Sequence, residues 1–247
     1  MLAYSTLNPE RLESIVLYLS IQMWQIRSGI QNIKSFWFRS ASISRMAKAE
    51  KSTKMGRPRG FDENAALDAA IRVFWEEGYE GATLAELTAA MKINRSSMFA
   101  AFGNKEALFK KAFERYVSTH LGHIWEALQK PTIRECLEHA LRRTVDFLST
   151  PGNPNGCLSV HGALATGPGG DPVKQWLIQG RKQGEAMVKR RFEQAKEAGE
   201  LPADTDPGAY ARYLETLIQG LGVQGANGAT RAEMNKMVDI ALKFMGY

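Results

Sequence analysis

Cysteine is scarce in this chain of 247 residues, and long apolar runs are missing from it. Its two cysteines, Cys136 and Cys157, are too few for a disulfide framework and favour a reducing cytoplasm as the location. No stretch reaches the roughly 18 uninterrupted apolar residues that a membrane-spanning helix needs. The best apolar segment, residues 15–26, is interrupted by serine and glutamine. We therefore expect no membrane partner.

Motifs that mark common enzyme classes are missing as well. The sequence has no G-x-S-x-G element, no H-E-x-x-H element and no glycine-rich phosphate loop after a strand. The run GPGGD at 167–171 lacks the lysine of such a loop, so we expect a plain connection between helices. The sequence therefore predicts neither an enzyme nor a cofactor.

Positive charge is concentrated at one end of the chain, whose formal net charge is +6. Residues 1–60 hold 10 Lys/Arg against 3 Asp/Glu, residues 61–120 hold 7 against 9, and residues 121–247 hold 15 against 14. A basic arm on a nearly neutral body is typical of proteins that contact nucleic acid. A solvated leader would have the same composition.

The first 54 residues fit poorly with the rest of the sequence. We interpret residues 1–54 as a leader upstream of the functional start, with translation beginning at Met46 or Met55. The alternative is a genuine additional helix in the apolar stretch near Ile15. No small-residue cleavage site follows that stretch, so a secretory signal is not indicated.

A short basic arm, residues 55–60, follows this leader. Arg57 and Arg59 flank Pro58, which holds the backbone extended. Arms of this kind lie in the DNA minor groove, where negative potential is focused. The sequence therefore predicts minor-groove contacts by the two guanidinium groups.

Two short helices joined by a tight turn are predicted over residues 83–102, TLAELTAAMKINRSSMFAAF. Thr83 and Asn94 are suited to cap the two helices, and apolar residues follow each cap at helical spacing. Ile93 is expected to be the buried plug of the turn. The outer face of the second helix would then show a guanidinium, a hydroxyl, an aromatic ring and a methyl group, from Arg95, Ser96, Phe99 and Ala100. Such a mixture suits phosphates, base edges and thymine methyls.

Capped helices are predicted on both sides of this pair. Asp62 is placed to begin the helix before it, and Gly78 to stop that helix. Asn104 is placed to begin the helix after it, with Lys105 in the first turn, where a cation opposes the helix dipole. A phosphate arriving there would meet helix N–H groups and an ammonium together, which favours a functional role for this lysine.

Residues 61–113 resemble the DNA-binding domain of the TetR family of bacterial transcriptional regulators. The GY-x-G-x-T entry, the turn, the aromatic residue Phe99 and the F-G-x-K-E-x-L exit all fall in register with that family. Two positions depart from its pattern: Lys92 stands where Gly is usual in the turn, and Phe99 stands where Tyr is usual. If position 92 is left-handed, Lys costs on the order of 1 kcal/mol more than Gly.

The resemblance extends in layout over residues 56–245 and implies an all-α fold. A helix-turn-helix DNA-binding domain would span 55–120, and a helical effector-binding and dimerisation domain would span 121–247. The implied function is a homodimeric repressor that a small molecule releases from a palindromic operator of double-stranded DNA. The implied DNA contacts are Arg57 and Arg59 in the minor groove, Arg95, Ser96 and Phe99 in the major groove, and Thr83, Ser97 and Lys105 on phosphates.

Amphipathic helices continue to the end of the chain. Their expected ranges are 106–128, 132–148, 157–166, 173–198, 207–224 and 230–245. The last two carry apolar faces that would form either an intramolecular core or, as the resemblance implies, a dimer interface. For the dimer, the chosen contact positions are Leu217, Leu221, Met237 and Ala241.

An apolar effector pocket is expected in the C-terminal part. Its candidate lining residues are Trp125, Phe147, Leu158, His161, Trp176 and Tyr213. Cys157 and His161 stand at i, i+4, so a metal or thiol sensor is an alternative, although no full set of metal ligands is predicted. A DNA-binding protein that responds to no effector is the other alternative.

Overall fold

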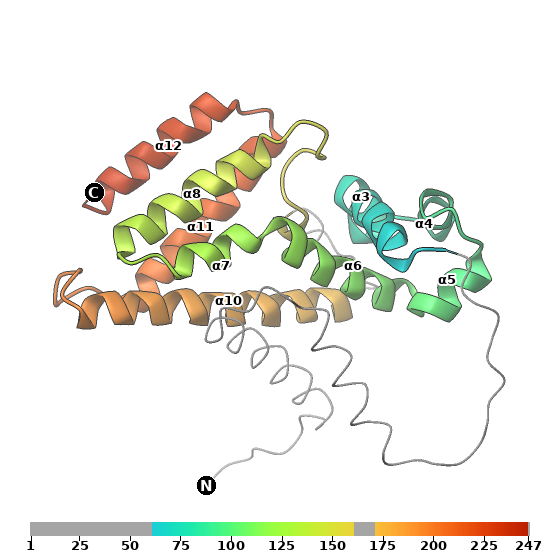
Figure 1. Cartoon of the computed structure of the whole chain (residues 1–247), viewed down its shortest axis with the longest axis horizontal. Helices are drawn as coiled ribbons and strands as arrows, with labels where there is room; N and C mark the ends of the chain where they lie inside the picture. The colour runs from blue at the N-terminus through green and yellow to red at the C-terminus, as the bar shows by residue number, and fades with distance from the viewer. Residues whose placement is uncertain (1–60, 161–170, 247) are drawn as a thin grey trace, which may run out of the picture. The chain divides into compact units, whose positions relative to one another are not determined.

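The computed structural model describes residues 61–160 and 171–246 (Figure 1). The expected leader, Arg57, Arg59 and His161 lie outside the described residues. Described elements, in chain order, are α3 Glu63–Gly81, α4 Leu84–Ala90, α5 Arg95–Phe102, α6 Lys105–His120, α7 Gly122–Leu128, α8 Ile133–Leu148, α10 Asp171–Glu197, α11 Pro207–Ala226 and α12 Arg231–Phe244. The expected all-α fold is confirmed, because these ranges contain no strand.

Most of these helices begin at a side-chain cap that the sequence provides. Asp62 accepts hydrogen bonds from the backbone N–H groups of Asn64, at 2.8 Å, and Ala65, at 3.3 Å. Thr132 and Thr230 cap α8 and α12 in the same way through the third residue of each helix. Each cap satisfies N–H groups that have no partner within the helix.

One expected helix is divided in the structure. The range 106–128 was expected to be continuous, but α6 ends at His120 and α7 begins at Gly122. Leu121 lies between them with φ −106° and ψ 11°, outside helical geometry. The apolar periodicity runs across this break, and Gly122, a weak helix former, is the only local sign of it.

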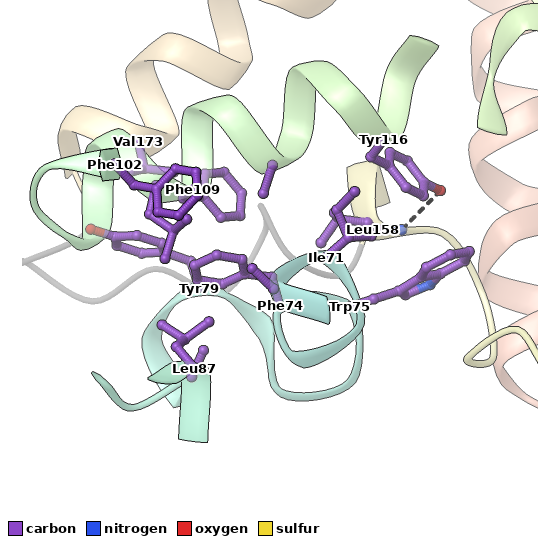
Figure 2. Close-up of a cluster of buried hydrophobic side chains, with 14 of the residues drawn as sticks. Ile71, Phe74, Trp75, Tyr79, Leu87, Phe102, Phe109, Tyr116, Leu158 and Val173 are labelled. Atoms are coloured by element: carbon purple, nitrogen blue, oxygen red, sulfur yellow. Dashed lines mark hydrogen bonds between the residues drawn. The ribbon is translucent and has the colours of Figure 1, made fainter. Parts of the chain in front are cut away.

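The N-terminal helices share a core, here called the N-terminal cluster, with a segment distant in sequence (Figure 2). Phe74 of α3 meets Phe109 of α6 edge to face, with ring centroids 5.0 Å apart. Trp75 of α3 meets Tyr116 of α6 in the same way at 5.0 Å. The Tyr116 hydroxyl in turn accepts a hydrogen bond from the Leu158 N–H at 3.3 Å. Residues 157–160 therefore belong to the same packed core as α3 to α6.

A second core, the C-terminal cluster, lies among α8, α10, α11 and α12. Leu141, Phe192, Leu214 and Val238, one from each helix, are at most 2% exposed. Arg142 of α8 also binds Asp239 of α12 at 2.9 Å on the surface. None of the described helices is long and apolar enough to span a membrane.

Candidate nucleic-acid interface

Helix α4 begins in a capping box. The backbone N–H of Glu86 donates to the Thr83 hydroxyl at 3.2 Å, and the Glu86 carboxylate accepts from the Thr83 N–H at 2.9 Å. The Thr83 hydroxyl itself donates to the same carboxylate at 2.7 Å. These bonds, the backbone one first, lower the pKa of Glu86. The predicted cap is confirmed, and any phosphate contact by Thr83 must compete with this box.

The turn after α4 closes in a Schellman motif. The Lys92 N–H donates to the Ala89 carbonyl, and the Ile93 N–H donates to the Thr88 carbonyl, both at 3.1 Å. Lys92 has φ 54°, so the left-handed conformation considered for this position is present. Ile93 packs against the N-terminal cluster but is only half-buried, so its description as a buried plug is corrected.

Helix α5 turns one face to the core and the other to solvent. Asn94 caps it by accepting from the Ser97 N–H at 2.7 Å, and the Ser96 hydroxyl donates to the same amide oxygen at 2.7 Å. Met98 and Phe102 are buried, at 0% and 2% exposure. The exposed residues of the helix are therefore those expected, namely Arg95, Ser96, Phe99 and Ala100, with Ser97 half-buried.

Arg95 and Phe99 are arranged together on this outer face. The guanidinium carbon of Arg95 lies 5.6 Å from the Phe99 ring centroid, and Phe99 is 40% exposed. A cation over an aromatic face is held in place without losing its hydrogen-bond donors. The pair thus presents a partly oriented guanidinium beside an apolar ring, a combination able to contact a guanine edge and a thymine methyl.

Lys105 lies at the start of α6 with contacts that its sequence position does not reveal. Its Nζ donates to the Glu80 carbonyl at 3.3 Å and lies 4.7 Å from the Tyr79 ring centroid. Burial lowers the pKa of Lys105, and the charge of Glu80 opposes this shift. These contacts offset the unfavourable helix dipole, so the placement of Lys105 no longer requires a ligand as its explanation.

Two family models match the chain on either side of α7. The model described as bacterial regulatory proteins, tetR family, matches residues 66–112, and the one described as Tetracyclin repressor-like, C-terminal domain, matches residues 134–236. YezE, an HTH-type transcriptional regulator of Bacillus subtilis, is 30% identical over 193 residues, which cover 77% of this chain and 100% of YezE. The chain belongs to the TetR family of bacterial transcriptional regulators.

Other relatives of this TetR chain are repressors or have been solved with DNA. The HTH-type transcriptional repressor ComR of Escherichia coli is 27% identical over 188 residues, covering 75% of this chain and 88% of ComR. A cysteine mutant of the TetR family transcriptional regulator CifR was solved with 26-base-pair operator DNA. That structure is 38% identical, has a TM-score of 0.73, and covers 76% of this chain and 98% of its own.

The residues expected to line an effector pocket lie in different surroundings. Phe147, Leu158 and Trp176 belong to the N-terminal cluster or pack against it, and Leu158 has no exposed surface. Trp125 of α7 is half-buried outside both clusters, whereas Tyr213 of α11 is 42% exposed. Three of the five therefore share one cluster, whereas Trp125 and Tyr213 lie outside it, because helical periodicity shows an apolar face but not its neighbour. A shared pocket stays a prediction.

The four residues expected at the dimer interface differ in their exposure to solvent. Leu221 and Ala241 are 2% and 4% exposed within the C-terminal cluster, and Leu217 packs against it half-buried. Only Met237, at 39% exposure, lies on the surface. Leu221 and Ala241 are thus corrected to core positions of the subunit.

Cys157 lies at the junction between several helices. Its Sγ is 3.0 Å from the Tyr116 hydroxyl and 2.9 Å from the Ser159 hydroxyl, and the residue is buried. Burial raises the pKa of the other thiol, that of Cys136, to about 11. Within the two described ranges, no three His, Cys, Asp or Glu side chains gather as a metal site.

An open hollow of about 160 Å³ lies between α8 and α12. Its lining residues are Arg134, Glu138, Arg142, Asp239 and Leu242. Arg142 is engaged there by Glu138 at 3.0 Å as well as by Asp239. Effector pockets are typically apolar and about 300–1,000 Å³ in volume, so this hollow does not resemble one.

Proposed function

We propose that this chain is a repressor that binds a palindromic operator as a homodimer and leaves it when a small molecule binds. The observation that carries the proposal is the outer face of α5. There, Arg95, Ser96 and Phe99 are exposed on a helix whose opposite side is fixed in the core. A short helix presented in this way is what a helix-turn-helix protein places in the major groove.

Each operator contact follows from the chemistry of one side chain. Arg95 would donate to a guanine edge, and the Phe99 ring would cover a thymine methyl. The Ser96 hydroxyl would lie with them in the major groove. Ser97 and Lys105 would bind phosphates beside the groove, with Thr83 at the start of α4. Arg57 and Arg59 would follow the minor groove, as the sequence predicts.

Dimerisation is supported by an apolar surface on α12. Met237, Ile240 and Phe244 are 39%, 56% and 82% exposed and follow each other at helical spacing. Val223 and Tyr213 of α11 are also exposed, at 40% and 42%. Burying such a surface against a second copy would set the distance between two recognition helices, which must match about one turn of DNA. We therefore replace Leu221 and Ala241 by Ile240 and Phe244 as contact positions.

The effector would act where residues 157–160 meet α6, α10 and α11. Arg181 of α10 donates to the Ser159 carbonyl at 3.0 Å, and burial lowers the pKa of this arginine. Gly222 of α11 approaches the same segment so closely that a Cβ there would lie 3.4 Å from the Val160 side chain. A ligand that displaces residues 157–160 would therefore push on several helices at once.

This junction is connected by contacts to the DNA-binding helices. The Cys157 thiol touches the Tyr116 hydroxyl, and the Tyr116 ring packs on Trp75 of α3. Such a chain of contacts gives an effector a physical route to α3 if the junction has two arrangements. A Tyr116→Phe variant tests the route: we expect operator binding to persist and its release by effector to weaken.

Two measurements on the purified protein test the proposal. Selection from a random double-stranded DNA library should enrich a palindrome, and sedimentation should show a dimer on it. A thermal-shift screen of metabolites should then find a ligand that stabilises the protein and releases the palindrome. Enrichment of a palindrome with no stabilising ligand would favour the effector-independent alternative, whereas release by an oxidant or by Zn²⁺ would favour the sensor alternative through Cys157.

A further inference from the structure

The turn between α4 and α5 contains a residue that its backbone conformation does not favour. Among the described residues, Lys92 is the non-glycine residue with φ in the left-handed region, and it occupies the Schellman position after α4. Glycine takes this conformation without steric cost, whereas a residue with a Cβ is strained there. The Lys92 side chain thus stands at a position where glycine would make the folded state more stable.

The cations of residues 61–120 divide into two groups. This range carries seven Lys and Arg against nine Asp and Glu, so its own charge repels DNA. Five of the seven cations donate to a carbonyl or carboxylate of the same subunit, namely Arg72, Lys105, Lys110, Lys111 and Arg115. The side chains of Lys92 and Arg95 make no hydrogen bond or ion pair with the described residues, and the Arg95 guanidinium rests on the Phe99 ring.

Lys92 also lies beside the surface proposed to meet DNA. It is exposed, and it stands two residues before Asn94, the cap of α5, and three before Arg95. Affinity for DNA comes largely from cations that replace condensed counterions on phosphates. A cation without a side-chain partner in the described part of the chain, next to the start of the recognition helix, is placed to do this.

We infer that Lys92 binds a phosphate of the operator, beside the groove that α5 enters. This inference rests on the proposed operator binding and adds a residue to it. The competing account is that Lys92 serves only α4, because a cation near a helix C-terminus interacts favourably with the dipole. That account predicts an effect on stability and none on DNA binding.

Three variants at this position separate the two accounts. Lys92→Gly removes the charge and the strain, Lys92→Asn removes the charge with a residue that tolerates left-handed φ, and Lys92→Arg keeps the charge. Lys182→Gln, on the exposed surface of α10, is the matched loss of one positive charge elsewhere. Operator affinity is measured over a salt series, with the midpoint of thermal unfolding as the control for folding.

For a dimer with one such contact in each half-site, the plot of log K against log salt should become shallower in Lys92→Gly and Lys92→Asn. The magnitude of its negative slope should decrease by about 1.8. Their affinity should fall by about tenfold or more near 0.1 M salt, while Lys92→Arg and Lys182→Gln stay near the parent. An unchanged slope in the Gly and Asn variants, or an equal loss in Lys92→Arg, would overturn the inference. If the parent protein selects no operator at all, the proposed function fails together with the inference about Lys92.

Discussion

Replacing Ile240 by glutamate places a carboxylate in the middle of the exposed apolar surface of α12. Ile240 is 56% exposed and lies between Met237 and Phe244 in the helical stripe. Fully burying an isoleucine side chain is worth about 1.5–3 kcal/mol. Since slightly more than half of Ile240 remains to be covered, a partner would gain about 1–1.5 kcal/mol from it. The two-fold symmetry of a dimer doubles this to about 2–3 kcal/mol.

The carboxylate adds a cost of its own. Each glutamate would be buried without a partner charge, which brings the total loss to at least about 4 kcal/mol. At about 1.4 kcal/mol for each factor of ten, the dimer dissociation constant should rise by about a thousandfold or more. Affinity for a palindromic operator should then fall to the level of non-specific DNA, because one subunit covers a single half-site.

Sedimentation over a range of concentrations measures this constant directly. Ala232→Glu is the matched control, since it adds the same charge at an exposed position in the first turn of α12. Thermal unfolding is compared at a protein concentration low enough for both variants to be monomeric. The two unfolding midpoints should then be closely similar. Persistence of the Ile240→Glu dimer at the parental dissociation constant would refute the assignment of this surface to the dimer.

Three further changes give separate tests. Arg95→Ala should cost about 1–3 kcal/mol of operator binding and relax the preference at one base pair, read from a second round of library selection; a loss shared equally by all DNA sequences would argue for a phosphate contact instead. Thr83→Ala should lower stability by about 1 kcal/mol through loss of the α4 cap, and Thr83→Ser should restore it, as followed by denaturant unfolding; equal stability of the two variants would contradict the role of the cap. Burial, with the charge of Glu185, raises the pKa of Glu215 to about 7, against the charges of Arg181 and Arg212. Because this folded-state pKa lies above the unfolded one, the stability that Glu215 contributes is present below about pH 4.3 and is lost as the pH rises through 7. Glu215→Gln should therefore stabilise the protein by about 1–2 kcal/mol at pH 8, after discounting for solvent screening, and by little near pH 4.5, in denaturant unfolding at both values.

The local features of the DNA-binding helices could be predicted because they depend on residues close in sequence. Asp62, Thr83, Asn94 and Asn104 each cap the helix that follows them, as their hydroxyl, amide or carboxylate groups indicate. The exposed face of α5 followed from helical periodicity alone, since Met98 and Phe102 fix which side is buried.

The C-terminal sites could not be predicted in the same way, because they depend on which helices become neighbours. Leu221 and Met237 both lie on apolar faces, yet one is buried in the subunit and the other is exposed. The contacts of Lys105 with Glu80 and of Tyr116 with Cys157 join residues 25 and 41 positions apart. Nothing in the local pattern of either residue indicates its partner.

The most direct test of the central claim compares two DNA duplexes of equal length and composition. One carries the palindrome selected from the library and the other carries the same bases in scrambled order, and the purified protein is titrated against both at one salt concentration. Sequence-specific regulators typically bind their site about 10³–10⁷ times more tightly than other DNA. We expect a preference of at least about 10³, which Arg95→Ala should reduce by the loss of about 1–3 kcal/mol given above. Equal affinity for the two duplexes would contradict the claim that α5 recognises an operator.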